Sequence, residues 1–340
     1  MNGSSPYQRF AVLGAGAWGT ALALALQRSG REVTLWSRRA ELAAEIDRTR
    51  ENADYLPGIK LPPEIGATAD LAVAAEAEAL LLVAPAQHLR TLCRQLAGRL
   101  QADCPLVICA KGIEQGSLAL MTEAAAAELP GQPLAVLSGP NFAAEVAAGL
   151  PAATTIAADP ESLAQDLVAA FGSRAFRPYA SGDPVGAQVG GAVKNVIAIA
   201  CGIVTGRKLG DNARAALVTR GLAEVGRLAQ ALGARPETLM GLSGLGDLVL
   251  TCGAMQSRNY SLGVALGQGR AIAEILGERR SVTEGVTSAA AVTALARRHG
   301  VELPICQAVE GLVNNGADLD DIIAGLLSRP FTTEAPKGTK

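Results

Sequence analysis

The sequence has little net charge, few histidines and no regularly spaced cysteines. Its 340 residues carry a formal net charge of −2, which gives no support for binding to nucleic acids or membrane surfaces. The six cysteines show no C-x-x-C spacing, so we expect reduced thiols rather than disulfides or a zinc site. The two histidines, His88 and His299, stand alone. Because no H-x-x-x-H pattern or carboxylate cluster accompanies them, we expect surface histidines and no metal.

The sequence also shows no sign of a targeting signal, a membrane-spanning segment or an internal repeat. The N-terminal stretch MNGSSPYQRF lacks the basic region and following apolar stretch of a secretory signal. No run of about 18 residues is free of polar residues and glycines, as a membrane span demands. We find no repeat of roughly 20–50 residues. With 49% hydrophobic and 18% charged residues, the chain is expected to be soluble, globular and long enough for two domains.

Short apolar runs alternate with helix-like segments in the first half of the chain. The runs are RFAVLG (9–14), REVTLW (31–36), EALLLVAP (78–85), PLVICAKG (105–112), PLAVLSGP (133–140), AATTIAAD (152–159) and RAFRPYAS (174–181). Strands that alternate with helices indicate βαβ units and a mostly parallel sheet. Continuous apolar runs are typical of strands that are covered on both faces. We also expect a helix over 160–171.

After residue 183 the pattern changes, because every later segment has helical periodicity. We therefore predict an α/β fold in two parts: a Rossmann-type doubly wound sheet over 1–183, and an all-helical domain over 184–340. Residues 1–7 and roughly 332–340 are interpreted as loose tails.

A glycine-rich turn follows the first predicted strand and opens a helix. It reads Gly14-Ala15-Gly16-Ala17-Trp18-Gly19, a G-x-G-x-x-G pattern that in this context predicts dinucleotide binding. The first glycine permits the tight turn, the second lets a pyrophosphate approach the backbone, and the third lets helix and sheet pack closely. Free N–H groups at the helix start would meet the phosphates. The alternatives are a tight turn without a ligand and, for Trp18, a core aromatic.

The end of the second predicted strand bears on the choice of nucleotide. An acidic residue there would bind the ribose 2′-hydroxyl of NAD, but the sequence has Ser37-Arg38-Arg39 instead. Two guanidinium groups suit the 2′-phosphate of NADP. The alternative is that Arg38 and Arg39 form a solvated helix start.

Polar residues follow two further strands at the edge where doubly wound sheets bind ligands. Lys111 ends one of these runs, and the segment 138–143 ends the next; either could instead be an ordinary turn. In the second half, Asp247 and Thr251 would share a face if 247–251 is helical. Ser257-Arg258-Asn259 places a guanidinium beside two hydrogen-bonding side chains, a set that suits a phosphate monoester.

One lysine, Lys194, lies in the apolar segment AQVGGAVKNVIAIACGIVTG (187–206). A helix that is apolar on nearly all sides is expected to be buried. A buried, unpaired ammonium would lose much of its hydration, so Lys194 should face a polar cleft or a partner. The alternative is a side chain that snorkels to solvent at the domain edge.

Together these motifs resemble the NAD(P)-dependent glycerol-3-phosphate dehydrogenase family of the bacterial biosynthetic type. The matching stretches are GAGAWGTALA, AKGIE, SGPNFAAE, GAVKNVIAIACGI, LSGLGDLVLTC, SRNYSLG and VTEGVTSA, in the expected order from about residue 10 to residue 330. The resemblance implies reversible reduction of dihydroxyacetone phosphate to sn-glycerol 3-phosphate, which supplies glycerophospholipid biosynthesis. It also implies a cytoplasmic enzyme, a homodimer, and NADP or NAD as cofactor. Between the two cofactors, Arg38 and Arg39 favour NADP, which is NADPH in the reducing direction.

The resemblance implies that residues 1–183 bind the dinucleotide and that residues 184–340 carry substrate-binding and catalytic residues. It also implies a role for individual residues. It assigns Lys194 as the proton donor and acceptor. Around it stand four more catalytic residues, namely Lys111, Asn195, Asp247 and Thr251. The cofactor residues are Gly14, Gly16, Ala17, Trp18, Gly19, Arg38, Arg39, Lys111, Ala143, Arg258, Val282 and Glu284. The substrate residues are Lys111, Gly139, Asn141, Lys194, Asp247, Ser257, Arg258 and Asn259. Many relatives have serine or threonine in place of Asn141; a backbone contact would survive that difference, but a hydroxyl contact would not.

Two other functions are compatible with parts of this pattern. The β-hydroxyacid dehydrogenases also pair a Rossmann domain with a helical domain that carries a Lys-x-x-Asn-like site, but their substrates carry a carboxylate instead of a phosphate. The segment 247–259 would distinguish the two substrate classes. A cofactor-binding redox sensor without catalysis would have no need for Lys194 or Asp247.

Overall fold

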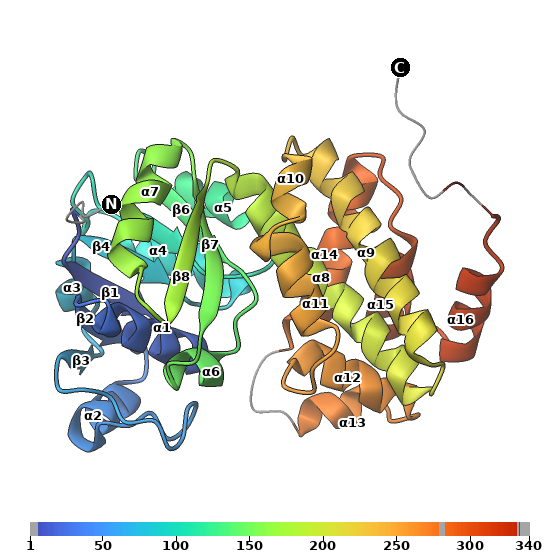
Figure 1. Ribbon diagram of the computed structural model, residues 1–340, viewed down its shortest axis with the longest axis horizontal. Helices are drawn as coiled ribbons and strands as arrows, with labels where there is room; N and C mark the ends of the chain where they lie inside the picture. Colours follow the sequence, from blue (N-terminus) through green and yellow to red (C-terminus); the bar gives the residue numbers. More distant parts are fainter. Residues whose placement is uncertain (1–5, 279–282, 332, 334–340) are drawn as a thin grey trace.

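The computed structural model describes residues 6–278, 283–331 and 333, and it has a sheet-containing part and a helical part side by side (Figure 1). The strands are β1 (Arg9–Leu13), β2 (Glu32–Trp36), β3 (Ile65–Thr68), β4 (Ala79–Leu82), β5 (Leu106–Ile108), β6 (Leu134–Ser138), β7 (Ala152–Ala158) and β8 (Phe176–Ser181). The helices between them are α1 (Ala17–Arg28), α2 (Ala40–Thr49), α3 (Leu71–Ala75), the 3₁₀ turn η1 (Ala86–His88), α4 (Leu89–Leu96), α5 (Met121–Glu128), α6 (Ala143–Ala147) and α7 (Glu161–Phe171). The second part contains α8 (Pro184–Gly206), α9 (Asp211–Ala231), α10 (Pro236–Leu239), the π-helical turn η2 (Leu242–Gly246), α11 (Asp247–Thr251), α12 (Arg258–Gly267), α13 (Ile272–Gly277), α14 (Glu284–Arg298), α15 (Pro304–Asn315) and α16 (Leu319–Leu327).

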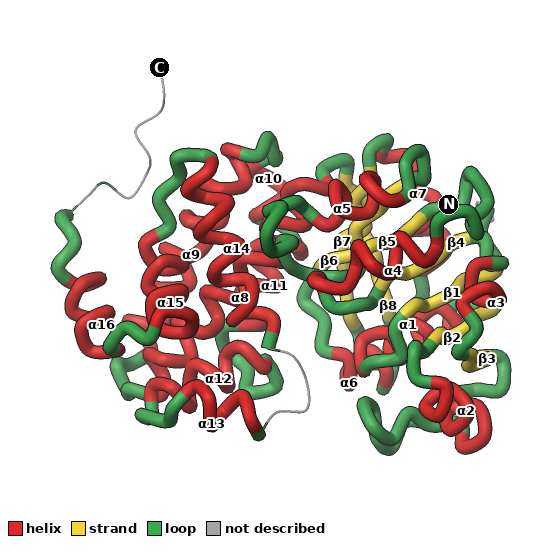
Figure 2. Tube along the Cα trace, turned by 180° about the vertical axis from the view of Figure 1, so that it is seen from behind, coloured by secondary structure: helices red, strands yellow, loops and turns green. Residues whose placement is uncertain are grey.

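The eight strands form one sheet in the order β3-β2-β1-β4-β5-β6-β7-β8. Helices cover both of its faces, as Figure 2 shows from behind. Alternate residues of β1 point to opposite layers: Phe10 and Val12 pack with α1 and α7, whereas Ala11 and Leu13 pack with α4 and α5. The apolar runs in the sequence follow from this double coverage. The predicted Rossmann-type doubly wound sheet is therefore confirmed.

Two features of the sheet differ from a simple reading of the apolar runs. β3 was not among the predicted strands, because its sequence, Ile65-Gly-Ala-Thr68, contains one large apolar residue and lies at the sheet edge. β7 pairs with β6 in the antiparallel sense, and β8 is parallel to β7. The prediction of a mostly parallel sheet holds for the strands from β3 to β6.

The second part is built around α8, which packs against α9, α12, α14 and α15. Within residues 184–278, 283–331 and 333 the structure contains no strand, so the predicted all-helical second part is confirmed. α8 begins at Pro184, at the predicted boundary, with Asp183 capping it by accepting a hydrogen bond from Gly186 N. The division into two independent domains stays a prediction. By length and composition α8 could span a membrane, yet 89% of its most apolar window is buried inside the protein.

Glycines bring α8 and α12 into unusually close contact. A Cβ on Gly202 would lie 2.1 Å from the backbone oxygen of Tyr260, and one on Gly263 would lie 2.1 Å from that of Ile199. Only glycine allows two helix backbones to approach to this distance. The contact brings the N-terminus of α12, with Arg258 and Asn259, beside the middle of α8.

Candidate active site

The glycine-rich turn between β1 and α1 has the geometry of a phosphate-binding loop. Gly14 has φ +133°, which favours glycine, and a Cβ on Gly19 would lie 1.8 Å from the Gly14 oxygen. A Cβ on Gly16 would instead meet nothing within 4 Å. No side chain caps the N-terminus of α1, so its first N–H groups can meet an anion. Open backbone at Gly16 and an uncapped helix start fit the pyrophosphate of a dinucleotide.

Asn52 supports this turn from a distant loop, and the sequence analysis did not single it out. It is fully buried, and its Nδ2 donates to Ala15 O at 2.9 Å and to Thr20 Oγ1 at 2.8 Å. Nothing in the local sequence marks this asparagine, because the turn that it stabilises lies 37 residues away. Ala17 and Trp18 begin α1, and Trp18 packs, partly buried, against the core beneath the turn.

The two arginines after β2 have different surroundings. Both are exposed, but Arg39 Nη2 forms an ion pair with Asp54 Oδ2 at 2.6 Å. Arg38 has no comparable partner among the described residues. Arg38 is therefore the guanidinium that is available to a 2′-phosphate, whereas Arg39 already has a counter-ion.

Lys194 does not snorkel to solvent. It is 7% exposed, and its Nζ donates to Asp247 Oδ1 at 2.5 Å and to Thr251 Oγ1 at 2.9 Å. Asp247 and Thr251 lie one turn apart on α11, as the i, i+4 spacing predicts. The single cation of α8 is thus paired with a carboxylate from a neighbouring helix.

Lys111 reaches the same carboxylate from the sheet. It follows β5, and its Nζ donates to Asp247 Oδ2 at 2.5 Å and to Gly139 O at 3.2 Å. A Cβ on Gly191 of α8 would lie 3.4 Å from Cγ of Lys111, so this glycine leaves room for the lysine stem. One carboxylate therefore binds two ammonium groups, one from each part of the molecule.

The pKa values in this cluster follow from burial and shared charge. The pKa of Lys194 is lowered to about 8, chiefly by burial; the nearby Lys111 acts in the same direction, whereas Asp247 opposes the shift. Burial would raise the pKa of Asp247, but Lys111 and Lys194 together outweigh it, and the net shift is downward. The carboxylate remains ionised, and Lys194 can gain or lose a proton near neutral pH.

A π-helical turn positions Asp247 so that its carboxylate faces α8. η2 ends at Gly246, immediately before Asp247, and π-turns often occur at functional sites. A Cβ on Gly190 of α8 would lie 2.6 Å from the backbone oxygen of Ser243, and a Cβ on Gly244 would lie 2.1 Å from that of Leu239. The glycines of the sequence GLSGLGD thus permit a tight coil against α8, which carries the carboxylate to the lysines.

The segment 257–259 lies at the start of α12, beside Asn195. Ser257 caps the helix, since its Oγ accepts a hydrogen bond from Tyr260 N at 3.2 Å. Asn259 Nδ2 donates to Asn195 Oδ1 at 2.9 Å. Arg258 is the first helical residue, and its positive charge acts on the carboxyl group of Glu284.

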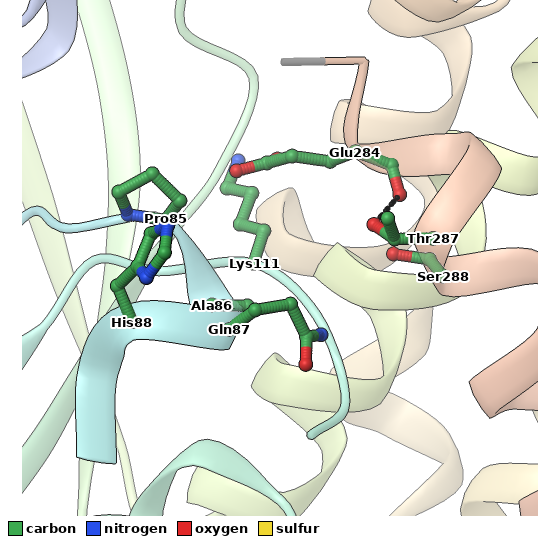
Figure 3. A pocket seen from close by; sticks show the side chains of 8 residues that line it. All are labelled: Pro85, Ala86, Gln87, His88, Lys111, Glu284, Thr287 and Ser288. Carbon is green, nitrogen blue, oxygen red and sulfur yellow. Dashed lines mark hydrogen bonds between the residues drawn. The ribbon is translucent and has the colours of Figure 1, made fainter. Parts of the chain in front are cut away.

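A cavity of about 170 Å³ lies where the two parts meet (Figure 3). Its lining includes Pro85, His88 and Lys111 from the sheet side and Glu284 and Ser288 from α14. The side chain of Glu284 extends across it toward Lys111. Burial raises the pKa of Glu284, an effect that Arg258, Lys111 and Lys194 oppose. His88 and His299 are both exposed, as predicted; Val282 lies outside the described residues.

The loop after β6 lies on the sheet side of the cluster. A Cβ on Gly139 would lie 2.8 Å from Cα of Thr154, so the loop packs tightly on β7. Asn141 Nδ2 donates to Ala153 O at 2.7 Å, while its Oδ1 is buried without a partner. Ala143 begins α6 and packs against the core of the sheet.

Comparisons with known proteins point in one direction. Two family models, described as the N-terminus and the C-terminus of NAD-dependent glycerol-3-phosphate dehydrogenase, match residues 9–164 and 183–324. The chain is 58% identical over 328 residues to a protein of Parvibaculum lavamentivorans named glycerol-3-phosphate dehydrogenase [NAD(P)+]. The alignment covers 96% of this chain and 98% of that protein. The corresponding protein of Rhodospirillum rubrum is 60% identical over 325 residues, 95% of this chain and 93% of that one. A solved glycerol-3-phosphate dehydrogenase from Coxiella burnetii has 40% identity and a TM-score of 0.91, covering 95% of this chain and 99% of that chain.

Proposed function

Because the chain belongs to the NAD-dependent glycerol-3-phosphate dehydrogenase family, we propose that it reduces dihydroxyacetone phosphate to sn-glycerol 3-phosphate and uses NADPH at least as well as NADH. The family and the 58% identical relative make the chain an NAD(P)-dependent oxidoreductase. The proposal adds the direction of the reaction and the cofactor preference.

The observation that carries the chemistry is the cluster of Lys111, Asp247 and Lys194. Two ammonium groups share one carboxylate, so the cluster has a net positive charge where an alkoxide would develop. Such a charge stabilises the transition state of carbonyl reduction. With a pKa of about 8, Lys194 is suited to donate a proton to the alkoxide and to accept it in the reverse reaction.

The nicotinamide, when bound, supplies the hydride that adds to the substrate carbonyl. The glycine-rich turn from Gly14 to Gly19 would hold its pyrophosphate, and Arg38 would bind a 2′-phosphate. Glu284, Ala143 and Lys111 are the candidates for contact with the rest of the cofactor. Thr251 and Asp247 hold the ammonium of Lys194 in one position, and Lys111 adds a second positive charge.

Phosphate recognition favours this function over β-hydroxyacid oxidation. Arg258 at the start of α12 offers a guanidinium to a phosphate, which would orient the reacting carbon through remote binding energy. The family match lies with enzymes named for a phosphorylated substrate. A sensor without catalysis would not need Lys194, Asp247 and Thr251 in one hydrogen-bonded set.

The biological setting extends the same proposal. We place the enzyme in the cytoplasm as a homodimer that supplies sn-glycerol 3-phosphate to glycerophospholipid biosynthesis. The burial of α8, the one helix of the described residues that is long and apolar enough to span a membrane, supports a protein without membrane insertion.

The test is to mix the protein with NADPH and dihydroxyacetone phosphate and to follow the loss of nicotinamide absorbance. A 3-oxo acid is the comparison substrate for the hydroxyacid alternative. We expect turnover with dihydroxyacetone phosphate and none with the 3-oxo acid. Lys194→Ala should fold, bind NADPH and lose turnover by about 10²-fold or more, the usual contribution of general acid–base catalysis. Near-normal turnover of the folded variant, or preference for the oxo acid, would reject the proposal.

A further inference from the structure

Three segments of the helical part meet at one buried side-chain amide, that of Asn259. Asn259 is 7% exposed and Asn195 is 4% exposed. Asn259 Nδ2 donates to Asn195 Oδ1 on α8 at 2.9 Å. Asn259 Oδ1 accepts from Gly285 N on α14 at 2.9 Å. The amide therefore joins α8, α12 and α14 next to Lys194, Arg258 and Glu284.

The backbone fixes the direction of these hydrogen bonds. Gly285 N can only donate, so Asn259 must turn its oxygen toward it and its nitrogen toward Asn195. Asn195 must then present its own oxygen to Asn259. This leaves Asn195 Nδ2 as a buried donor without a partner in the protein. An unpaired buried donor is costly, which suggests that a bound ligand provides the acceptor.

The start of α14 depends on the same amide. Thr283, the residue before the helix, makes no side-chain capping bond, and Gly285 N is one of the N–H groups that a helix start leaves unpaired. Asn259 satisfies it from another helix. A Cβ on Gly285 would lie 2.7 Å from Asn195 O and 2.7 Å from Asn259 Oδ1, so only glycine fits at this contact.

We infer that Asn259 is a positioning residue whose side-chain amide orients Asn195 toward the substrate and fixes the start of α14, with Glu284, against α8. The inference rests on the proposed function and deepens it. The resemblance gave Asn259 direct contact with the substrate; here one of its two N–H groups and its oxygen are bonded within the protein. Removing this amide would break the hydrogen-bonded link between α8, which carries Lys194, and the start of α14, which carries Glu284.

The test separates positioning from direct phosphate binding. Rates are measured for the wild type, Asn195→Ala, Asn259→Ala and the double variant, with dihydroxyacetone phosphate and with unphosphorylated dihydroxyacetone. Small misplacements of a reacting group can cost about 10²-fold, so we expect Asn259→Ala to lower kcat by about 10- to 100-fold with both substrates. We expect the double variant to be no more than about twofold slower than the slower single variant. Arg258→Ala, the phosphate reference, should affect the phosphorylated substrate far more.

Either of two kinetic results would overturn the inference: a loss confined to the phosphorylated substrate, or a double variant whose loss equals the product of the single losses. If Asn259→Ala does not fold, Gly285→Ala tests the same contact without removing a polar group. It should lower kcat, whereas Gly325→Ala on α16, where a Cβ meets nothing within 4 Å, should not.

A wild type that reduces neither ketone rejects the proposed function instead. The contact is then judged by non-additive unfolding midpoints of the Asn195 and Asn259 variants, and additive midpoints reject it.

Discussion

At the scale of single residues, the pKa of Lys194 links the buried cluster to the pH range of the enzyme. Reduction needs the protonated ammonium, and oxidation needs the neutral amine. Because burial lowers this pKa to about 8, kcat/KM for ketone reduction should fall as pH rises through about 8. The same parameter for alcohol oxidation should rise over that interval. For the free enzyme this profile reports the pKa of the essential group.

The matched variant for this prediction is Lys194→Arg, which stays protonated across the whole range. Its residual reduction should show no step near pH 8, and its oxidation should be lost. A step that persists unchanged in this variant would assign the titration to another group.

Cofactor choice is a second property of single residues. Arg38 and Arg39 should favour NADPH, and replacing both with alanine should weaken NADPH binding much more than NADH binding. Because Asp54 pairs with Arg39, Arg38→Ala alone should weaken NADPH by about 10- to 150-fold, the range of a charge-assisted hydrogen bond. Asp54→Asn should strengthen the binding of NADPH, because Arg39 would lose its counter-ion. Fluorescence titration of both nucleotides measures this directly, and equal losses for both would show that the arginines do not contact the 2′-phosphate.

At the scale of helices and strands, the close contact of α8 and α12 positions the segment 257–259. Gly202→Ala and Gly263→Ala would each place a Cβ 2.1 Å from a backbone oxygen, which no side-chain rotation can relieve. Such overpacking costs about 1–3 kcal/mol or more, and we expect lower midpoints of denaturant unfolding together with a higher KM for the phosphate substrate.

The control is Gly226→Ala in α9, where a Cβ would meet nothing within 4 Å. This change should be neutral or stabilising by up to about 1 kcal/mol, because alanine favours helices more than glycine does. Equal effects of all three substitutions would mean that helix propensity, and not the close contact, sets the stability.

Sequence patterns predicted the strands whose runs contain several apolar residues and missed β3, which contains one large apolar residue. The apolar runs at β1 and β4 are covered on both faces, and each was predicted. β3 was missed because only Ile65 is fully buried in it. Lys194 could be singled out because a lone cation in an apolar helix calls for a partner. Its distance in sequence from Asp247 and Lys111 is bridged only by the folded arrangement, as is the contact of Asn52 with the glycine-rich turn.

At the scale of the whole molecule, Asp247 holds the sheet part and the helical part together. Asp247 is 1% exposed, and its carboxylate binds Lys111 from one part and Lys194 from the other. Asp247→Asn would leave two ammonium groups facing each other without a counter-ion. Breaking a buried ion pair costs about 3–5 kcal/mol, so we expect a lower unfolding midpoint and faster hydrogen exchange in α11.

Asp211→Asn is the matched comparison, since that carboxylate pairs with Arg214 at the surface. Exposed pairs contribute little, and the unfolding midpoint should hardly change. An Asp247→Asn protein as stable as the wild type would show that other contacts join the two parts.

The position of α8 in the chain has a consequence for the growing polypeptide. Four of the helices that pack against it, α9, α12, α14 and α15, follow it in sequence, and α15 ends about 110 residues later. At a synthesis rate of about 5–20 residues per second, those residues take about 5–20 s to appear. During that interval α8, a helix as apolar as a membrane span, lacks these four helices. A nascent chain paused after α8 has left the ribosomal exit tunnel, but before α12 is made, should therefore bind chaperones more strongly than one paused at residue 183 or released at full length.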